Sequence, residues 1–465
     1  FLLVILLLAS ACGRDEYEIE HEAEYEIEYD YKVTSYIWEE WELEYVNIDE
    51  WKEDIEHFRA TILRRHPKFA DRTINTLHRN IEIGEAFNER IDQLINNVPY
   101  LTKFEILAEL QRSLVVFENS HFQFGASSSL LRGEQVAFLY QITQNRYPLE
   151  FGWFDDGFYL FRAAESSDAA LALNQKLVAI NDIYIEDIFE KFQDFWNMGN
   201  VYFARGAFAH FLNSPGILYA LGVKHGEQTT YEFLGDNNEM IFAHITESLL
   251  RTNQRTFTID WHLSLQEPLI DRRAEGELPL FLQNQRQNQW YTFVEDYGLL
   301  YIKINAYLFS AQFAADIANL IDIKGESLRA TIIDARTNPG GNDIDFYNFF
   351  NALAEATPPG RLFYFMNETS LSAALIAGGY LYGLGAIIVG QPSGQSTDFY
   401  AGTLPSFLPN SGFGLPIPSA FFSMRVEFGI ESEDLIFRPH VHIEYTIDDW
   451  FNNRDPLLEY VLGLL

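Results

Sequence analysis

From Tyr291 to the C-terminus, short apolar runs typical of strands alternate with helical segments, and this alternation limits the possible folds more than any other feature of the chain. We expect strands at residues 299–304, 330–335, 361–366 and 386–389, and helices at 346–356 and from about Leu371. Strands that alternate with helices form βαβ units around a largely parallel sheet. The sequence therefore predicts a mixed α/β fold over residues 290–465.

One stretch of this region, residues 371–390, contains twenty residues and no charge, which is long enough for a membrane helix. Gly383 and Gly385 interrupt it, and the β-branched run after them favours a strand. We therefore expect a buried helix that leads into a buried strand.

Two further regions precede the α/β region. Trp51, Ile55, Phe58 and Ile62 recur at three- and four-residue steps, so residues 47–132 are predicted to form an N-terminal helical domain. Residues 147–245 contain short aromatic-rich runs and an Asn181-Asp182 turn between two apolar segments. This region resembles a PDZ-like domain, with Asn174 and Asp182 at positions where such domains usually have glycine, and the alternative is a generic mixed domain. Both residue types tolerate the left-handed backbone that glycine would supply.

Charge excludes one class of partner. The 465 residues include 32 Lys and Arg against 67 Asp and Glu, a net charge of -35 that repels phosphate backbones, so we expect no nucleic-acid binding. The only cysteine, Cys12, excludes an internal disulfide and any Cys-rich metal site. We expect no cofactor and no metal.

The N-terminus predicts the location of the protein. An apolar run ends in Ser10-Ala11-Cys12 and resembles a lipoprotein signal over residues 1–12, with Cys12 as the lipidated residue. Residues 13–46 carry 13 acidic residues against Arg14 and Lys32, which is typical of an extended, self-repelling tether. We expect a lipid anchor on the extracytoplasmic face of the cell membrane. The alternatives for the apolar run are an ordinary cleaved signal and a buried strand.

Two loops carry residues suited to catalysis. The segment 334–342, Asp-Ala-Arg-Thr-Asn-Pro-Gly-Gly-Asn, follows a predicted strand at the position where open α/β sheets bind ligands. The next strand leads through Thr369 and Ser370 to Ser372, which directly precedes a predicted helix. A serine there can present its hydroxyl while the helix N-terminus stabilises negative charge, although serines at helix starts are usually caps.

Together with Val389-Gly-Gln-Pro-Ser-Gly394, Leu408-Pro-Asn-Ser-Gly412 and Arg454-Asp-Pro, these motifs resemble the tail-specific (C-terminal processing) and tricorn-type serine peptidases over most of residues 47–465. The resemblance implies a crotonase-like α/β peptidase core beside the helical and PDZ-like domains. It also implies that Ser372 is the nucleophile, and that the N–H of Gly340 or Gly341 forms an oxyanion hole with that of Ala373.

The base distinguishes two branches of this family. Tail-specific members place a lysine in the loop after Val-Gly, near Ser396 in this chain, but residues 391–397 contain no lysine. Tricorn-type members use a Ser-His pair and a Glu, which the resemblance places at Ser120, His121 and either Glu431 or Glu433. A histidine base predicts activity that rises with pH near ~6.5.

These features predict a membrane-tethered serine endopeptidase that cleaves peptides or unfolded proteins, gripping them through strand addition to the PDZ-like domain. Two alternatives are a catalytically degenerate peptide-binding lipoprotein of the same fold and a solute-binding lipoprotein. His440 and His442 have a spacing that could suit a metal pair, but without a third ligand in the sequence we interpret both as structural.

Overall fold

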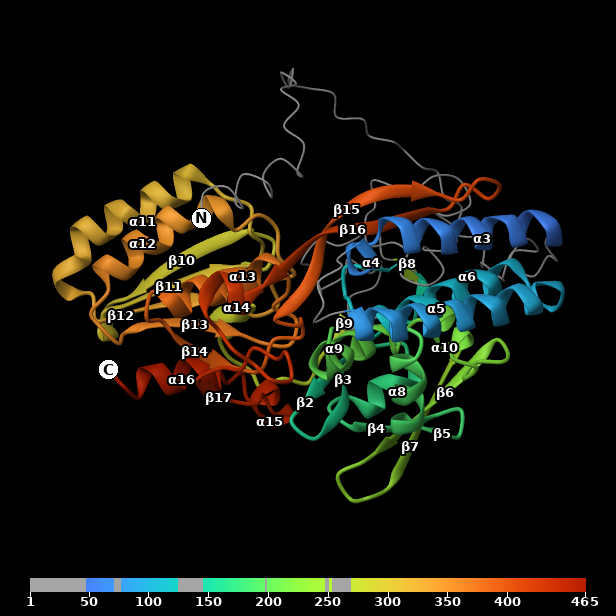
Figure 1. The fold of residues 1–465 in the computed structure, drawn as a ribbon. Helices are drawn as coiled ribbons and strands as arrows, with labels where there is room; N and C mark the ends of the chain where they lie inside the picture. The colour runs from blue at the N-terminus through green and yellow to red at the C-terminus, as the bar shows by residue number, and fades with distance from the viewer. Residues whose placement is uncertain (1–46, 71–76, 124–144, 197–198, 247–250, 253–268) are drawn as a thin grey trace, which may run out of the picture.

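The computed structural model describes residues 47–70, 77–123, 145–196, 199–246, 251–252 and 269–465 (Figure 1). The predicted signal with Cys12, the acidic tether 13–46 and residues 124–132 of the predicted helical domain lie outside the described residues. Within the described part of the chain, no helix combines the length and the apolar character needed to cross a bilayer.

The C-terminal part of the chain builds a six-stranded sheet from the described residues, in the order β10-β11-β12-β13-β14-β17. Strand β10 is antiparallel to β11, and every later pair is parallel. The strands are β10 (Gln289–Val294), β11 (Leu299–Ile304), β12 (Ala330–Asp334), β13 (Leu362–Met366), β14 (Ile387–Gly390) and β17 (Val441–His442).

Helices cover both faces of this sheet, because its strands carry apolar side chains on both sides. Leu300 and Ile302 of β11 pack in one core with helices α11 (Ala311–Lys324), α12 (Tyr347–Ala356) and α13 (Ala373–Gly383). Leu299 and Tyr301 pack in the other core with α16 (Pro456–Leu462). The helices are α11 (Ala311–Lys324), α12 (Tyr347–Ala356), α13 (Ala373–Gly383), α14 (Met424–Phe428), α15 (Ile447–Phe451) and α16 (Pro456–Leu462).

The elements predicted for this region are confirmed to within one or two residues. The uncharged stretch 371–390 is a helix, α13, followed by a buried strand, β14, as the sequence predicts. The largely parallel character of the sheet and the mixed α/β class are confirmed as well.

A second, antiparallel sheet precedes this region in the chain. Its main order is β2-β3-β4-β6-β7, and the predicted Asn181-Asp182 turn has both residues in the left-handed region, with φ of 51° and 61°. Its elements and the neighbouring pair β1·β8 are β1 (Asn145–Arg146), β2 (Leu149–Phe154), β3 (Gly157–Ala164), β4 (Lys176–Ile180), β5 (Ile183–Tyr184), α8 (Ile185–Gln193), α9 (Val201–Phe211), α10 (Pro215–Ala220), β6 (Gln228–Leu234), β7 (Met240–Thr246), β8 (Arg251–Thr252) and β9 (Leu269–Ile270).

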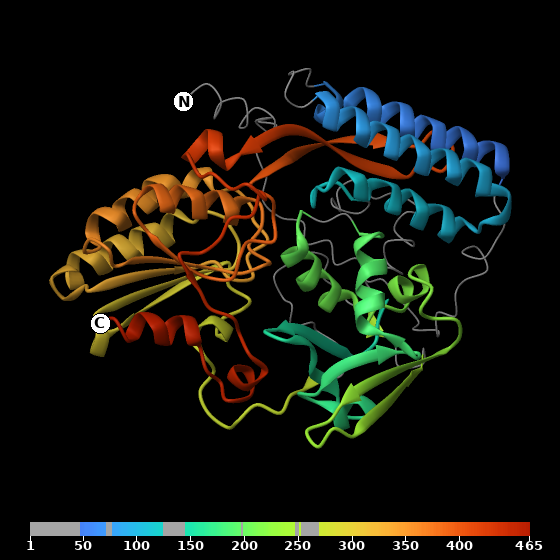
Figure 2. The same cartoon turned by 60° about the horizontal axis from the view of Figure 1, so that its bottom comes forward.

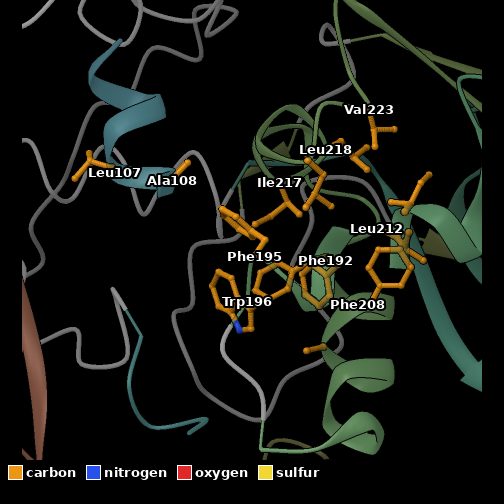
Figure 3. Close-up of a cluster of buried hydrophobic side chains, with 14 of the residues drawn as sticks. Leu107, Ala108, Phe192, Phe195, Trp196, Phe208, Leu212, Ile217, Leu218 and Val223 are labelled. Carbon is orange, nitrogen blue, oxygen red and sulfur yellow. The ribbon is translucent and has the colours of Figure 1, made fainter. Parts of the chain in front are cut away.

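The N-terminal described residues form the helices α3 (Ile48–Arg65), α4 (Pro67–Ala70), α5 (Leu77–Asn97) and α6 (Lys103–Ser113). The α6 helix begins with a capping box between Thr102 and Glu105. Buried side chains of these helices belong to the same core as those around α8, α9 and α10, and Figure 3 shows part of that core. The helices and the second sheet therefore share one hydrophobic core.

Short 3-10 helices connect several of these elements: η1 (Val98–Tyr100), η2 (Leu114–Phe117), η4 (Asp168–Ala172), η6 (Leu280–Leu282), η7 (Glu295–Tyr297), η8 (Gly325–Ser327) and η9 (Ile344–Phe346).

A long hairpin of β15 (Asp398–Phe407) and β16 (Gly414–Ser423) leaves the α/β body and reaches across to the N-terminal helices, as both views show (Figures 1 and 2). Its turn is held by α3, where the buried carboxylate of Asp54 accepts the N–H groups of Asn410 and Ser411, each at 2.8 Å. Phe413 after the turn packs on Trp51 with ring centroids 6.2 Å apart. The hairpin thus ties together two bodies that are far apart in sequence.

Candidate active site

Ser372 lies at the point where the chain leaves β13 and starts α13. Its backbone has φ 52° and ψ -119°, and its side chain makes no capping hydrogen bond to the helix. Positive φ is uncommon outside glycine and stores strain, and nucleophilic serines on sharp strand-to-helix turns are exposed in this way. Within the described residues, no hydrogen bond is made by the Ser372 hydroxyl. Ser372 therefore does not cap the helix. The nearby Ser370 hydroxyl, in contrast, donates a hydrogen bond to the carbonyl of Ala335 and accepts the N–H of Asn367.

Gly340 lets the second loop lie directly against Ser372. A Cβ on Gly340 would stand 2.7 Å from the Cβ of Ser372, so any side chain there would collide with it, and φ at Gly340 is 114°. Asn338 fixes this approach, since its carbonyl accepts the N–H of Leu371 at 3.0 Å and its side-chain oxygen accepts the N–H of Gly340 at 2.8 Å. The two predicted loops therefore meet at one point.

The geometry separates the two glycines that the sequence left as alternatives. The N–H of Gly340 is already bonded to Asn338. The N–H groups of Gly341 and Ala373 have no partner among the described residues, and the latter is one of the free donors at the start of α13. Of the candidate oxyanion donors, these two are available for a substrate oxygen.

His121 follows η2 at the end of the helical region and is half-buried beside β15. Its backbone N–H donates to the side chain of Asn119 at 3.3 Å, and Asn119 donates to the carbonyl of Tyr400 at 3.0 Å. The imidazole stacks on Phe399, with centroids 5.6 Å apart and planes 12° from parallel. Burial lowers the pKa of His121 to about 4, so the ring is neutral at pH 7 and holds a lone pair for a proton.

Gln395 connects His121 to Ser372, and the sequence did not single it out. Its side chain is 1% exposed; Oε1 accepts the backbone N–H of Ser372, and Nε2 lies 3.2 Å from Nδ1 of His121. The Ser393 hydroxyl helps to hold it by accepting the N–H of Gln395 at 3.2 Å. Gln395 belongs to the loop 391–397, and nothing in its local sequence predicts which groups the two ends of its amide contact.

This bridge fixes the state of the imidazole. The backbone N–H of Ser372 is always a donor, so the Gln395 atom facing it is the oxygen and the atom facing His121 is the nitrogen. Nδ1 of His121 therefore accepts a hydrogen bond, and the neutral ring carries its proton on Nε2. In this arrangement the lone pair of His121 is bonded to Gln395 and not to the Ser372 hydroxyl.

The remaining candidates lie apart from this centre. The carbonyl of Ser120 accepts the side chain of Gln123 at 2.9 Å, and no hydrogen bond of the Ser120 hydroxyl joins it to His121 in the described chain. Glu431 and Glu433 are exposed and, among the described residues, make no hydrogen bond or ion pair. Ser396 is buried and forms an isolated bridge to Ile436. The structure thus brings Ser372, His121, Gly340 and Ala373 together, but neither glutamate with them.

A buried charge network supports the glycine loop from below. Arg336 binds the carboxylates of Asp334 and Asp455, and Lys303 donates to the carbonyl of Arg336 at 2.6 Å. Tyr301 donates to Asp334 at 2.6 Å. Burial alone would raise the pKa of Asp334, but Arg336 and Lys303 outweigh it and lower the pKa to about 2. The Asp-x-Arg motif and the Arg-Asp-Pro tail are therefore structural partners.

The two histidines of the predicted pair have separate contacts. His440 accepts the N–H of Ile388 through Nδ1 at 2.9 Å and stacks on Tyr382 with centroids 5.1 Å apart. Nε2 of His442 lies 2.8 Å from a carboxylate oxygen of Glu444. Both contacts agree with structural roles.

Comparison with known proteins shows which solved structures share this fold. No family model and no curated protein matches the chain. Among solved structures, mature CPAF is similar over 89% of this chain and 96% of that chain, with a TM-score of 0.55 and 12% identity. A mutant of CPAF gives a TM-score of 0.57 at 11% identity over 89% of this chain and 96% of that chain.

The photosystem II D1 C-terminal processing protease is aligned over 90% of this chain and 97% of that chain at 14% identity, with a TM-score of 0.38. The likeness to CPAF covers a similar share of both chains at the higher TM-scores of 0.55 and 0.57. The chain therefore has the fold of CPAF.

Proposed function

We propose that this protein is a serine peptidase that cleaves peptide or protein substrates, with Ser372 as nucleophile and His121 as general base. The observation that carries the proposal is the link from the strained backbone of Ser372 through Gln395 to the neutral imidazole of His121. The shared fold with CPAF and the paired loops of the family resemblance support it.

In the proposed reaction, the Ser372 oxygen attacks the substrate carbonyl while its proton passes to His121. The carbonyl oxygen becomes negative and accepts the N–H groups of Gly341 and Ala373. The C–N bond then breaks as His121 returns the proton to the leaving amine. Water next attacks the acyl-enzyme while His121 takes a proton from it, and the Ser372 oxygen leaves with that proton, which releases the acid product. Because Gln395 bonds Nδ1 in the arrangement described, we interpret that arrangement as a resting state in which Gln395 must first release the lone pair.

A fluorophosphonate probe tests this proposal directly. The full chain should be labelled, Ser372→Ala should not be labelled, and His121→Ala should be labelled much more slowly. Ser370→Ala is the matched control, because it lies two residues away on the same turn and should keep the label. Equal labelling of the wild type and Ser372→Ala would contradict the assignment of the nucleophile.

One observation favours a second candidate, a catalytically degenerate peptide-binding protein of the same fold. The Ser372 hydroxyl makes no hydrogen bond to His121 in the described residues, and no charged group supports the imidazole there. Absence of labelling in folded wild-type protein that still binds unfolded peptides would select this candidate.

We also propose that a lipid on Cys12 tethers the protein to the extracytoplasmic face of the membrane, with residues 13–46 as a spacer. The apolar run before Cys12 and the acidic stretch after it support this location. In cells, Cys12→Ala should move the protein from the membrane fraction to the soluble fraction. Identical fractionation of the variant and the wild type would contradict the anchor.

The second sheet is proposed to be a PDZ-like module that captures an unstructured C-terminus by strand addition, and the sheet of the α/β body to be a crotonase-like core. The antiparallel order of β2, β3, β4, β6 and β7, with α8 after the Asn181-Asp182 turn, supports the first assignment. Variants of this module should raise KM for long peptides and leave the turnover of small esters nearly unchanged. Equal losses on both substrates would argue against capture.

A further inference from the structure

A cavity of about 200 Å³ lies beside the candidate site, between the second sheet and the two site loops. One wall comes from β2 and α9, and the other from Thr337 of the glycine loop and from residues 367–369, which lead to Ser372. Pockets that hold whole small molecules usually measure ~300–1,000 Å³, so this space suits a single side chain.

Glu368 supplies an uncompensated acid to this cavity. Its Oε2 is shielded from solvent and has no hydrogen-bond partner among the described residues. The other carboxylate of the lining, Glu150, lies 3.4 Å from Arg162 and is paired. Arg205 is the cation whose charge acts on Glu368, but its guanidinium lies 4.5 Å from the centroid of the Trp153 ring, and no described hydrogen bond or ion pair joins it to Glu368.

A carboxylate oxygen that is shielded from solvent and has no partner is costly, so the Oε2 of Glu368 points to a ligand that would complete it. Burial raises the pKa of Glu368 to about 7, as it does that of the paired Glu150, so the distinguishing feature of Glu368 is its partnerless Oε2 and not its pKa. A cation bound at Oε2 would restore the charged form.

The rest of the lining is mostly aromatic. Phe151, Trp153, Phe281 and Trp450 line the cavity, and guanidinium groups of the chain itself already lie over three of these rings: Arg205 on Trp153, Arg336 on Phe281 and Arg273 on Trp450. No lysine or arginine is among its described lining residues. The one imidazole, His210, is kept neutral because burial lowers its pKa well below the ordinary value.

Helix α9 is shaped to lie against Glu368. A Cβ on Gly206 would come within 3.2 Å of both Cγ of Glu368 and Cγ2 of Thr369. Glycine at this position therefore lets the helix pack closely on the loop that leads to Ser372, and any larger residue would push the carboxylate or the helix away.

We propose that this cavity is a subsite for a cationic side chain, lysine or arginine, of the peptide substrate, with Glu368 as its counter-ion. The inference rests on the proposed peptidase function for the identity of the ligand. Because Glu368 lies four residues before Ser372 in the segment between β13 and α13, a side chain bound there holds its peptide near the nucleophile.

Binding of small cations to the full chain carrying Ser372→Ala tests the subsite without any turnover. The probes are n-butylguanidinium and n-butylammonium, which stand in for arginine and lysine, with n-butylurea as the neutral match, all measured by calorimetry. We expect at least one cation to bind about tenfold or more tightly than n-butylurea, the size expected for a hydrogen bond to a charged group. The tighter of the two cations identifies the preferred residue.

Glu368→Gln should abolish this preference, and Glu150→Gln is the matched control because it removes a paired carboxylate from the same cavity. The control should keep the preference within about threefold. Equal binding of the cations and n-butylurea to the unaltered cavity would overturn the proposal, and this outcome needs no variant of the cavity. Cation binding by folded Glu368→Gln that is as tight as with Glu368 present would also overturn it.

The result is independent of the proposed chemistry. Cation binding at Glu368 without fluorophosphonate labelling of wild-type Ser372 would retain the subsite and refute the peptidase. Labelling of wild-type Ser372 without any preference for cations would retain the peptidase and refute the subsite. In an active enzyme, peptides with lysine or arginine should exceed those with norleucine or citrulline in kcat/KM, and Glu368→Gln should remove the difference.

Discussion

Phe399 lies flat against His121, with ring centroids 5.6 Å apart and planes 12° from parallel. The contact joins a residue of the α/β body to a residue that precedes it by almost three hundred positions. Phe399 is 3% exposed and starts the hairpin four residues after Gln395, so one short segment both stacks on the imidazole and bonds it.

Removing the stacked ring should impair catalysis more than stability. Phe399→Leu keeps an apolar side chain but leaves a smaller one at a buried position, a change that typically costs ~0.5–3 kcal/mol of unfolding free energy. The imidazole loses its flat support, and we expect kcat to fall about tenfold or more, since small misplacements of reacting groups are costly. Phe421→Leu on the exposed side of the same hairpin is the control, with kcat near that of the wild type. Equal effects of the two variants on kcat would refute a positioning role.

The pH profile should extend further into acid than the sequence predicts. An ordinary histidine base gives activity that rises near pH ~6.5, but burial lowers the pKa of His121 to about 4. The neutral, proton-accepting form therefore predominates from about pH 5 upward, and kcat/KM for a peptide without lysine or arginine, which does not depend on Glu368, should be flat from there to pH 8. Measurement with a fluorogenic peptide checks this, and His121→Ala should lower kcat about 10²–10⁴-fold at every pH. A midpoint at 6.5 would show that the imidazole is solvated in the working enzyme.

Gln395→Glu should move the acid limb of that profile upward. The new carboxylate can still accept the N–H of Ser372, but towards His121 it can only accept, so Nδ1 must carry a proton. An adjacent negative charge favours the protonated ring and raises the pKa of His121, by about 1–3 units for close pairs. Gln395→Leu, which adds no charge, should show no upward shift. Identical profiles for all three proteins would mean that Gln395 does not contact the base during catalysis.

The charge network under the glycine loop should contribute strongly to stability. Asp455→Ala leaves the buried guanidinium of Arg336 with one partner instead of two, and loss of one member of a buried pair typically costs ~3–5 kcal/mol of unfolding free energy. Asp434→Ala breaks the Arg438 pair on the surface and should change the free energy of unfolding little, because solvent screens exposed ion pairs. Urea unfolding of the two variants measures the contrast, and similar losses would contradict it.

The same network sets the response to acid. The pKa of Asp334 is about 2 in the folded protein and ~3.9 in an unfolded chain, so its contribution to stability is present above pH ~4 and is lost as the pH falls toward 2. Asp334→Asn should be less stable at pH 7 and should lose less of its remaining stability over that interval. Urea midpoints measured at pH 2, 3, 4 and 7 test the prediction, and parallel curves for wild type and variant would refute it.

The strands of the α/β body could be predicted from the sequence because each is a short apolar run bounded by polar or turn residues, as with β11 and β12. Ser372 and the glycine loop could be placed together because both follow neighbouring parallel strands, whose carboxyl ends share one edge. Local pattern was enough for these features.

Contacts between distant segments could not be predicted. Gln395 and His121 are 274 residues apart, and nothing in either neighbourhood encodes the direction of an amide. Spacing could not tell that the N–H of Gly340 is consumed by Asn338, nor that Glu431 and Glu433 face solvent. Glu368 gave no signal, because an acid next to a cap-forming turn is ordinary until the packing of α9 buries it.

The hairpin also connects the candidate active site to a distant contact, the one between its turn and Asp54 of α3. Strands β15 and β16 each run ten residues, about 33 Å at the usual rise per residue, from the Gln395 loop to the grip of Asp54 on the turn. A slip of one residue at that grip displaces the strand by about 3.4 Å relative to the helices that carry His121, which exceeds the reach of a hydrogen bond. Because the same strand leads back to Phe399 and Gln395, we expect displacement of the hairpin tip from α3 to disturb the contacts that these two residues make with His121.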